Sequence, residues 1–351
     1  MANTVLATGL GLTKWSSSFI KEAVRSSAFK PYMGGPGSFI VVDRDKLKTG
    51  GERVRFAHLL KLRGPGVTGC ARLKGNEEAL GTDFDEVKIQ WHRNAVQISK
   101  CQSSRTDLDL MEGARDMLAE NAGEVLKNDI VDAMRSFIVA GTDDSTADTA
   151  VLASAANTAQ KNAHLTNNAD RTVVAGGAVV SGDYAATVAA ATAPMSAKVV
   201  RKAKDTAIRT ALGANYGIRP VKTDDEAGRD WFVMFVGLEG FEQLEVDPTI
   251  YAANKDARER NVDTNPIFQG GDLIYNGVII RQVAELPSGE AYLGGQNGIN
   301  LAWGQAVRPT KDVDDYGFAV GVGYEELRGQ KISSLNGTAT GIVRVLYNGA
   351  A

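Results

Sequence analysis

Residues 64–69 form the segment of the chain most similar to a known chemical motif. Their sequence, GPGVTG, has the GxGxxG spacing of a dinucleotide-binding loop, and Asp83 and Asp85 follow near the distance at which such a fold places a carboxylate for the ribose. That chemistry also requires a helix to begin at the glycines, so that the helix N-terminus meets the pyrophosphate. Residues 70–81 instead continue as a charged chain interrupted by glycine. We therefore expect no nucleotide site and no cofactor.

The histidines and the acidic clusters offer no better catalytic or metal site. His58 and His92 fall in expected strands and His164 in an Ala- and Asn-rich loop, so a His-centred site would have to be assembled from separate elements. The acidic cluster at 312–315 resembles half of a calcium-binding loop, but Gly323 stands where that loop needs a glutamate. Neighbouring side chains in a strand or helix point apart, which makes adjacent acidic residues poor acid–base partners. Such pairs are Glu77-Glu78, Asp224-Asp225 and Glu325-Glu326.

No nucleophile-elbow, zinc-protease or P-loop motif occurs in the sequence. Cys70 and Cys101 have neither CxxC spacing nor a nearby histidine. We therefore expect no catalytic residue, no metal ligand and no enzymatic activity.

Composition indicates a folded protein that neither spans a membrane nor coats nucleic acid. The 351 residues are 43% hydrophobic and 23% charged, with a net charge of −3, whereas a protein that coats nucleic acid would be strongly basic. No apolar stretch approaches the length of a membrane span, and residues 1–11 lack the pattern of a secretory signal. We expect a protein of the reducing cytoplasm.

Charge is divided unevenly along the chain. Residues 1–105 carry a net charge of +8 and residues 106–351 carry −11. Where copies of the chain meet, the basic part of one could lie on the acidic part of its neighbour. Two oppositely charged, solvated faces of a monomer are the equally open alternative.

Two runs of alternating apolar residues predict a long β-hairpin at 52–62 (ERVRFAHLLKL) and 84–99 (FDEVKIQWHRNAVQIS). Between them, residues 63–83 are dense in glycine and charge and can form neither a regular helix nor a buried strand. Because a two-stranded ribbon is only marginally stable alone, this hairpin needs a partner surface. Residues 1–38 predict an arm that packs against a domain or another copy.

Helical patterns follow the hairpin. Apolar spacing predicts a long helix from Thr106, a suitable N-cap, to about Ala140. A coiled coil is the alternative, although strict heptads are absent. Two further helices are predicted at 196–212, ended by Gly213, and at 248–260.

The remaining segments predict strands and turns. Residues 142–192, rich in Ala, Thr, Asn and Gly, are expected to be partly loop, and Asn336-Gly337-Thr338 a turn. Strands are predicted at 231–236, 277–283, 299–303, 316–322 and 341–347. The fold class is therefore α+β.

Several segments, in this order, resemble the major capsid proteins of tailed bacteriophages. The first is GPGVTGCARLKGNEEALG between two strands, followed by VKIQWHRNAVQIS and a long helix. The others are NKDARERNVDTNPIFQGG, YNGVIIRQV, and DYGFAVGVG followed by residues 326–337. Their order is that of the podovirus-type capsid family of the kind found in phage N-four, and the resemblance covers about residues 40–348.

The resemblance implies the Hong Kong-type (Johnson) capsid fold, an α+β fold with five parts. They are an N-terminal arm (1–38), an extended hairpin (39–105), a spine helix and peripheral domain with the Ala/Thr-rich segment (106–195), an axial domain (196–305) and C-terminal strands that return to the peripheral domain (306–351).

The resemblance also implies a coat protein that assembles with itself. Hexamers and pentamers would form an icosahedral shell around double-stranded DNA, assembled in the host bacterial cytoplasm and retained in the virion. Portal, scaffolding and decoration proteins would be further partners, and near-neutral charge implies loose, nonspecific contact with packaged DNA. No single lysine, asparagine and carboxylate stand out for the cross-link that some capsids of this fold form, so none is predicted.

The candidate functional residues lie at the hairpin tip. Its glycines would permit the backbone turns, and its charged residues would form ion pairs between subunits. The set is Arg63, Gly64, Gly66, Gly69, Arg72, Lys74, Gly75, Glu77, Glu78 and Gly81. A structural turn, not a binding site, is expected at Asn265, Pro266, Gly270 and Gly271.

Other protein classes stay open at this stage. An encapsulin-like shell protein or another phage structural protein would share much of the pattern. A soluble enzyme or carbohydrate-binding module with a long β-ribbon would need a pocket with convergent polar groups, for which the sequence offers no constellation.

Overall fold

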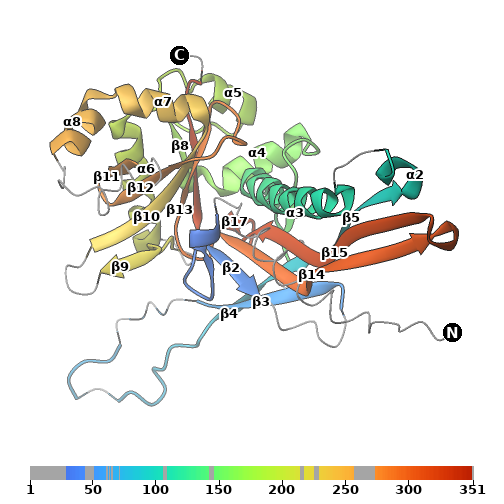
Figure 1. Cartoon of the computed structure of the whole chain (residues 1–351). Helices are drawn as coiled ribbons and strands as arrows, with labels where there is room; N and C mark the ends of the chain where they lie inside the picture. Colours follow the sequence, from blue (N-terminus) through green and yellow to red (C-terminus); the bar gives the residue numbers. More distant parts are fainter. Residues whose placement is uncertain are drawn as a thin grey trace.

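The computed structural model describes residues 29–43, 51–60, 62, 64, 66–70, 72–105, 109–141, 146–213, 217–224, 229–256 and 273–349. These residues form two large β-sheets with helices packed on them (Figure 1). The α+β class is confirmed. Within the described part of the chain, no helix is long and apolar enough to cross a membrane.

A seven-stranded mixed sheet forms one end of the molecule, with the strand order β11-β12-β10-β13-β18-β8 and β9 paired to β10. Its strands are β8 (Thr172–Val174), β9 (Lys222–Asp224), β10 (Arg229–Val236), β11 (Leu273–Tyr275), β12 (Val278–Gln282), β13 (Glu290–Gly294) and β18 (Ile342–Leu346). The apolar run WFVMFV lies in the central strand β10, whose side chains pack into a hydrophobic core on each face of the sheet. A strand covered on both faces requires such an unbroken apolar run. The strands predicted at 231–236, 277–283 and 341–347 are confirmed.

Helices cover one face of this sheet. They are α6 (Ala197–Gly213), α7 (Leu238–Val246) and α8 (Pro248–Asp256). On the opposite face, the rings of Phe29 and Phe39 pack on Phe235 with centroid distances of 5.1 and 5.2 Å. The two predicted helices are confirmed, the second as far as Asp256, where the described segment ends.

A five-stranded sheet extends to the other end, with the order β1-β2-β14-β15-β5. Its strands are β1 (Met33–Gly34), β2 (Ile40–Asp43), β5 (Gln90–Ser99), β14 (Ile299–Asp314) and β15 (Ala319–Ile332). The last two form a long ribbon that projects from the body in Figure 1. The ribbon turns at η3 (Asp315–Gly317), where Asp315 and Tyr316 have positive φ. The strand predicted at 316–322 therefore begins only at Ala319, because residues 315–317 close the turn.

The long helix is shorter than predicted. Helix α3 spans Leu110–Arg135, and the side chain of Asp109 accepts hydrogen bonds from the backbone N–H groups of Met111 and Glu112. Asp109 is therefore the N-cap, and Thr106 lies outside the described residues. The chain leaves the helix at Ser136, and β6 (Phe137–Val139) pairs with β7 (Thr149–Val151). Helix α3 packs on the five-stranded sheet rather than in a coiled coil.

The segment expected to be partly loop contains regular structure. It includes α4 (Thr158–Asn167), η2 (Ala169–Arg171), β8 and α5 (Tyr184–Ala189). Helix α4 begins with a capping box in which Asn157 and Gln160 bond to each other's backbone N–H groups. The prediction that His164 lies in a loop was wrong, because it is a buried residue of α4.

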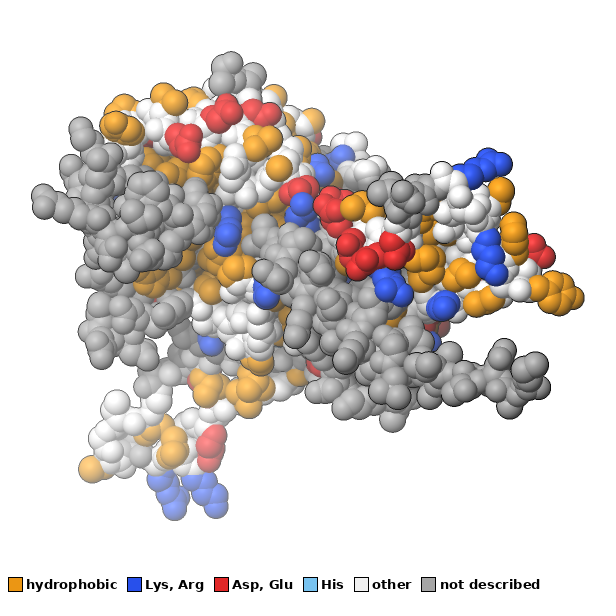
Figure 2. Space-filling model, in the orientation of Figure 1, with side chains coloured by type: hydrophobic (Ala, Val, Ile, Leu, Met, Phe, Trp, Pro, Cys, Tyr) orange, Lys and Arg blue, Asp and Glu red, His pale blue; other side chains and the backbone are white. Residues whose placement is uncertain are grey.

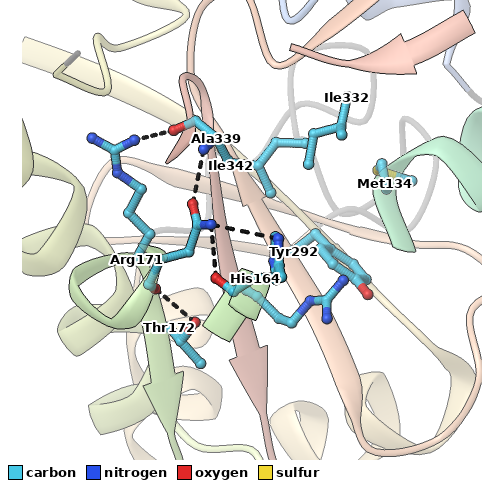
Figure 3. A pocket seen from close by; sticks show the side chains of 10 residues that line it. Met134, His164, Arg171, Thr172, Tyr292, Ile332, Ala339 and Ile342 are labelled. Atoms are coloured by element: carbon cyan, nitrogen blue, oxygen red, sulfur yellow. Dashed lines mark hydrogen bonds between the residues drawn. The ribbon is translucent and has the colours of Figure 1, made fainter. Parts of the chain in front are cut away.

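The turn at Asn336-Gly337 is confirmed between β16 (Ser334–Leu335) and β17 (Thr338–Ala339). Asn336 and Gly337 both have positive φ, as a two-residue hairpin of this kind requires. Asn168 holds the turn, because its amide donates to the Gly337 carbonyl and accepts from the Ala339 N–H. The cavity drawn in Figure 3 has a volume of about 10 Å³, which is room for one water at most.

The buried His164 predicts acid-sensitive stability. Its Nδ1 accepts a hydrogen bond of 3.0 Å from the Ile138 N–H, and burial, with Arg344 nearby, lowers its pKa from 6.5 to about 3. Above pH 6.5 neither the folded nor the unfolded state protonates this ring. Between pH 6.5 and about 3 only the unfolded state binds this proton. The free energy of unfolding therefore decreases by about 1.4 kcal/mol for each unit by which the pH falls through this range.

His164→Asn should remove that slope. The asparagine places an acceptor near the position of Nδ1 but does not titrate. Urea unfolding of the unassembled subunit from pH 7 to 4.5 measures the effect. Equal pH slopes for the variant and the parent protein would contradict it.

Candidate inter-subunit surface

The predicted hairpin has a regular stem. Strands β3 (Arg53–Leu59) and β4 (Thr82–Lys88) pair antiparallel, and the Leu60 N–H extends the ladder by donating to the Gly81 carbonyl at 2.9 Å. The predicted second strand, 84–99, was wrong as one element. It divides at Ile89 into β4 and β5, which belong to different sheets. Both runs were extended in sequence pattern, and only the tertiary pairing separates them.

The root of the stem is anchored by apolar contacts and one buried charge cluster. Val54, Phe56 and Val87 pack with Ala302 of β14. Asp85, which is fully buried, accepts hydrogen bonds from the Lys331 ammonium and from the Asn300 side-chain amide, the latter at 2.7 Å. Burial raises the pKa of Asp85, and Lys331 acts in the opposite direction. Asp85, one of the two carboxylates considered for a ribose, therefore pairs with Lys331 instead.

The tip beyond the stem extends away from the body (Figure 1). Gly66, Gly69 and Gly75 have positive φ, so the glycines supply turns that other residues rarely adopt. The Gly64 N–H donates to Glu78 and the Gly75 N–H to Glu77, each at 2.7 Å. These two carboxylates hold the backbone of the tip itself.

The other predicted tip residues have different roles. Gly81 lies against Leu60, where an added Cβ would be 2.8 Å from a methyl carbon of that leucine. Arg72 and Lys74 are exposed and form no ion pair within the described residues. Arg63 lies outside the described residues, as does the turn expected at Asn265, Pro266, Gly270 and Gly271.

Exposed leucines at the end of the stem and in the tip were missed by sequence reasoning. Leu59 is 69% exposed and Leu73 62%, and Leu62 and Leu80 are more than half exposed. In Figure 2 the lobe at lower left carries hydrophobic side chains, with Lys and Arg along its lower edge. The sequence does contain a signal for this surface, because four leucines stand in a segment that is too polar to form a core of its own.

A second exposed apolar surface lies at the end of the β14–β15 ribbon. Tyr316 is fully exposed in the strained turn, and Val313 and Phe318 are about half exposed beside it. In Figure 2 this end of the molecule, at the right, carries hydrophobic side chains beside charged ones, and Asp312, Asp314 and Asp315 are exposed there.

Charged side chains beside the stem pair with one another. A groove of about 740 Å³ beside the stem contains charged groups that are already paired, with Glu86 held by Arg53 and Arg55 and Asp129 by Arg328. His92 lies 3.9 Å from Asp129, and burial lowers its pKa. No group of three His, Cys, Asp or Glu side chains within the described residues could hold a metal ion.

The family model described as phage capsid protein matches residues 3–303. The chain belongs to the phage capsid protein family. The solved capsid of cyanophage Pam1 is 30% identical in sequence over 100% of both chains, with a TM-score of 0.80. The capsid of Ralstonia phage GP4 is 22% identical over 99% of this chain and 98% of that one, with a TM-score of 0.71. No curated protein matches the chain.

More distant structures share the fold. The acid-stable capsid of Helicobacter pylori bacteriophage KHP30 is 12% identical over 92% of each chain, with a TM-score of 0.63. The expected Hong Kong-type capsid fold is confirmed, and the molecule is a major capsid protein, a structural component of the virion that assembles with copies of itself. Membership of a structural family agrees with the expectation of no enzymatic activity.

Proposed function

We propose that this capsid protein closes into an icosahedral shell of hexamers and pentamers in which each hairpin tip lies across a neighbouring subunit. The observation that carries the proposal is the tip itself, a projection with exposed leucines and with two cations, Arg72 and Lys74, that form no ion pair among the described residues. An exposed apolar patch of this kind is characteristic of a protein interface. A typical interface of about 800 Å² per partner, repeated several times per subunit, gives a stable shell from individually weak contacts.

The division of the subunit follows from the same proposal. Residues 1–38 form the arm, 39–105 the extended hairpin, 106–195 the spine helix and peripheral domain, 196–305 the axial domain and 306–351 the returning strands. Strand β14 runs through residue 305, so the last boundary divides one long strand between two parts. The basic residues 1–105 would lie over acidic surfaces of neighbouring copies.

The remaining partners are proposed from the same role. Portal, scaffolding and decoration proteins bind the shell, and packaged DNA touches its inner surface loosely because the chain is nearly neutral. Assembly takes place in the host bacterial cytoplasm. Expression of the chain with and without a scaffolding protein, followed by ultracentrifugation and negative-stain electron microscopy, tests the proposal. Closed shells or capsomers are expected, and a persistent monomer in both conditions would overturn it.

Reversing the tip carboxylates should reduce particle yield. In Glu77→Lys with Glu78→Lys, the backbone N–H groups of Gly64 and Gly75 lose the carboxylates that accept their hydrogen bonds, so the tip loses the backbone shape that it presents to a neighbouring subunit. Glu77→Gln with Glu78→Gln is the matched control, because it keeps the acceptors and removes only the charge. The glutamine variant should weaken the contact between subunits by no more than the value of an exposed ion pair, up to about 1 kcal/mol for each substitution. A normal particle yield of the lysine variant at ordinary salt would contradict this role.

A further inference from the structure

Helix α7 presents an acidic and apolar face to solvent. Glu239, Glu242 and Glu245 are exposed on it, and the sequence has no Lys or Arg between Arg229 and Lys255. Figure 2 shows acidic side chains gathered over this helix at the top of the molecule. The charge of this face is therefore not balanced by neighbouring cations along the chain.

Apolar side chains accompany these carboxylates. Val246 is 81% exposed and Tyr251, on α8, is 61% exposed. Next to them, a groove of about 470 Å³ is walled by Pro194, Met195 and Pro248. An apolar groove bordered by charges of one sign is typical of a protein-binding surface, whereas a helix face that is only solvated has no such groove.

Helix α6 of the same domain presents the opposite charge. Its buried side, which includes Val200, Ala203 and Ala207, faces the sheet. Its solvent side carries four exposed cations, a single acid at Asp205 and the partly exposed Ile208, and a fifth cation, the half-buried Lys204, donates to the Asn276 carbonyl. The four cations are Lys198, Arg201, Lys202 and Arg209.

The two charged faces do not neutralise each other within one subunit. Helix α6 runs along β8 and β18, whereas α7 and α8 continue toward β11. Near the start of α6, the Ala197 N–H donates to Asp247 at 2.9 Å, and the N–H of the preceding Met195 donates to Gln243 at 2.7 Å. Among the described residues, no ion pair links the four exposed cations of α6 to the three glutamates of α7. A second copy can satisfy both faces.

We propose that the basic face of α6 docks on the acidic face of α7 and α8 of the next copy, which makes this contact the head-to-tail junction of the capsomer ring. A heterologous contact between two different faces of one chain generates a closed ring when its rotation closes. Opposite charges select the partner and its orientation, and the apolar groove supplies the buried centre. The inference rests on the proposed shell function and assigns the residues of one of its contacts.

Charge exchange between the two helices tests the junction. Glu239→Lys/Glu242→Lys/Glu245→Lys and Lys198→Glu/Arg201→Glu/Lys202→Glu should each lower the yield of assembled particles at least about tenfold, because like charges then meet. All six substitutions in one chain restore opposite charges across the junction and should recover a yield within about twofold of the parent protein. All substituted side chains are exposed, so circular dichroism and thermal melting of the subunits should be unchanged.

A reversal on α3 is the matched control. Glu112→Lys/Asp116→Lys/Glu120→Lys changes the same number of exposed carboxylates, and the α6 reversal should not rescue whatever loss it causes. Normal assembly of both triple variants would overturn the junction. Failure of the six-fold variant with folded subunits would also overturn it, and would indicate that a different protein covers α7. A parent chain that never assembles would instead refute the shell proposal, which keeps the two failures distinct.

Discussion

Replacing residues 61–80 by Asn-Gly should leave a folded subunit that no longer forms shells. Leu59 pairs with Thr82, and the Leu60 N–H donates to the Gly81 carbonyl, so the two strands are already in register for a two-residue turn. The excision removes three of the exposed leucines and all of the glycine turns, but none of the apolar residues at the root. Subunit stability should change by less than about 1 kcal/mol, because a shorter loop also costs less closure entropy.

Sedimentation and electron microscopy measure the loss of shells, and urea unfolding measures subunit stability. The matched control is Leu62→Ser/Leu73→Ser/Leu80→Ser, which keeps the loop and its glutamate–backbone bonds. It should also assemble poorly, since the leucines supply the apolar part of the contact. Wild-type shell yield from the excised chain would contradict the role of the tip.

Removing Asp85 should unfold or strongly destabilise the subunit. Asp85→Ala leaves the buried Lys331 ammonium without its carboxylate and the Asn300 amide without an acceptor. Breaking a buried ion pair by removing one partner costs about 3–5 kcal/mol, because the other charge stays buried. Urea unfolding of the unassembled subunit measures this loss.

Two variants make the Asp85 result interpretable. Lys88→Ala removes an exposed charge from the same strand and should change stability by no more than about 0.5 kcal/mol. Lys331→Met added to Asp85→Ala removes the stranded charge and should recover part of the loss. A loss below about 1 kcal/mol for Asp85→Ala alone would show that the cluster does not anchor the hairpin.

Local pattern predicted the elements whose burial is reflected in their own residues. The run 231–236 is apolar on every side because both faces of β10 are covered, and the spacing of α6 separates its buried and solvent faces. The turn at Asn336-Gly337 was predictable because two consecutive residues with positive φ favour this dipeptide.

Pairing between segments far apart in the sequence sets several element boundaries that local sequence pattern does not indicate. Nothing within residues 84–99 marks Ile89 as the division between two sheets, because β4 and β5 are both extended and differ only in their partners. Helix α3 ended early since Phe137, Ile138 and Val139 are used in a strand, although their apolar character also fits a helix. His164 was placed in a loop because its segment is rich in Ala and Asn, whereas a capping box starts a helix there.

The role of the hairpin tip as the functional site stays a prediction, and the structure shows contacts there that the sequence did not. Glycines and charges located the tip, and the family resemblance assigned it to a contact between subunits. The glutamates expected to pair with other subunits bond to the backbone of the tip, and the leucines, which were not considered, carry its exposed apolar surface. Exposure depends on what the rest of the fold fails to cover, which a local pattern does not reveal.

A cryo-electron-microscopy reconstruction of the shell formed by the full chain tests the central claim most directly. The expected map shows residues 60–81 of each subunit lying on a neighbouring subunit, with Leu62, Leu73 and Leu80 buried in that contact. A map in which the tip projects into solvent or folds back on its own subunit, in an otherwise closed shell, would contradict it.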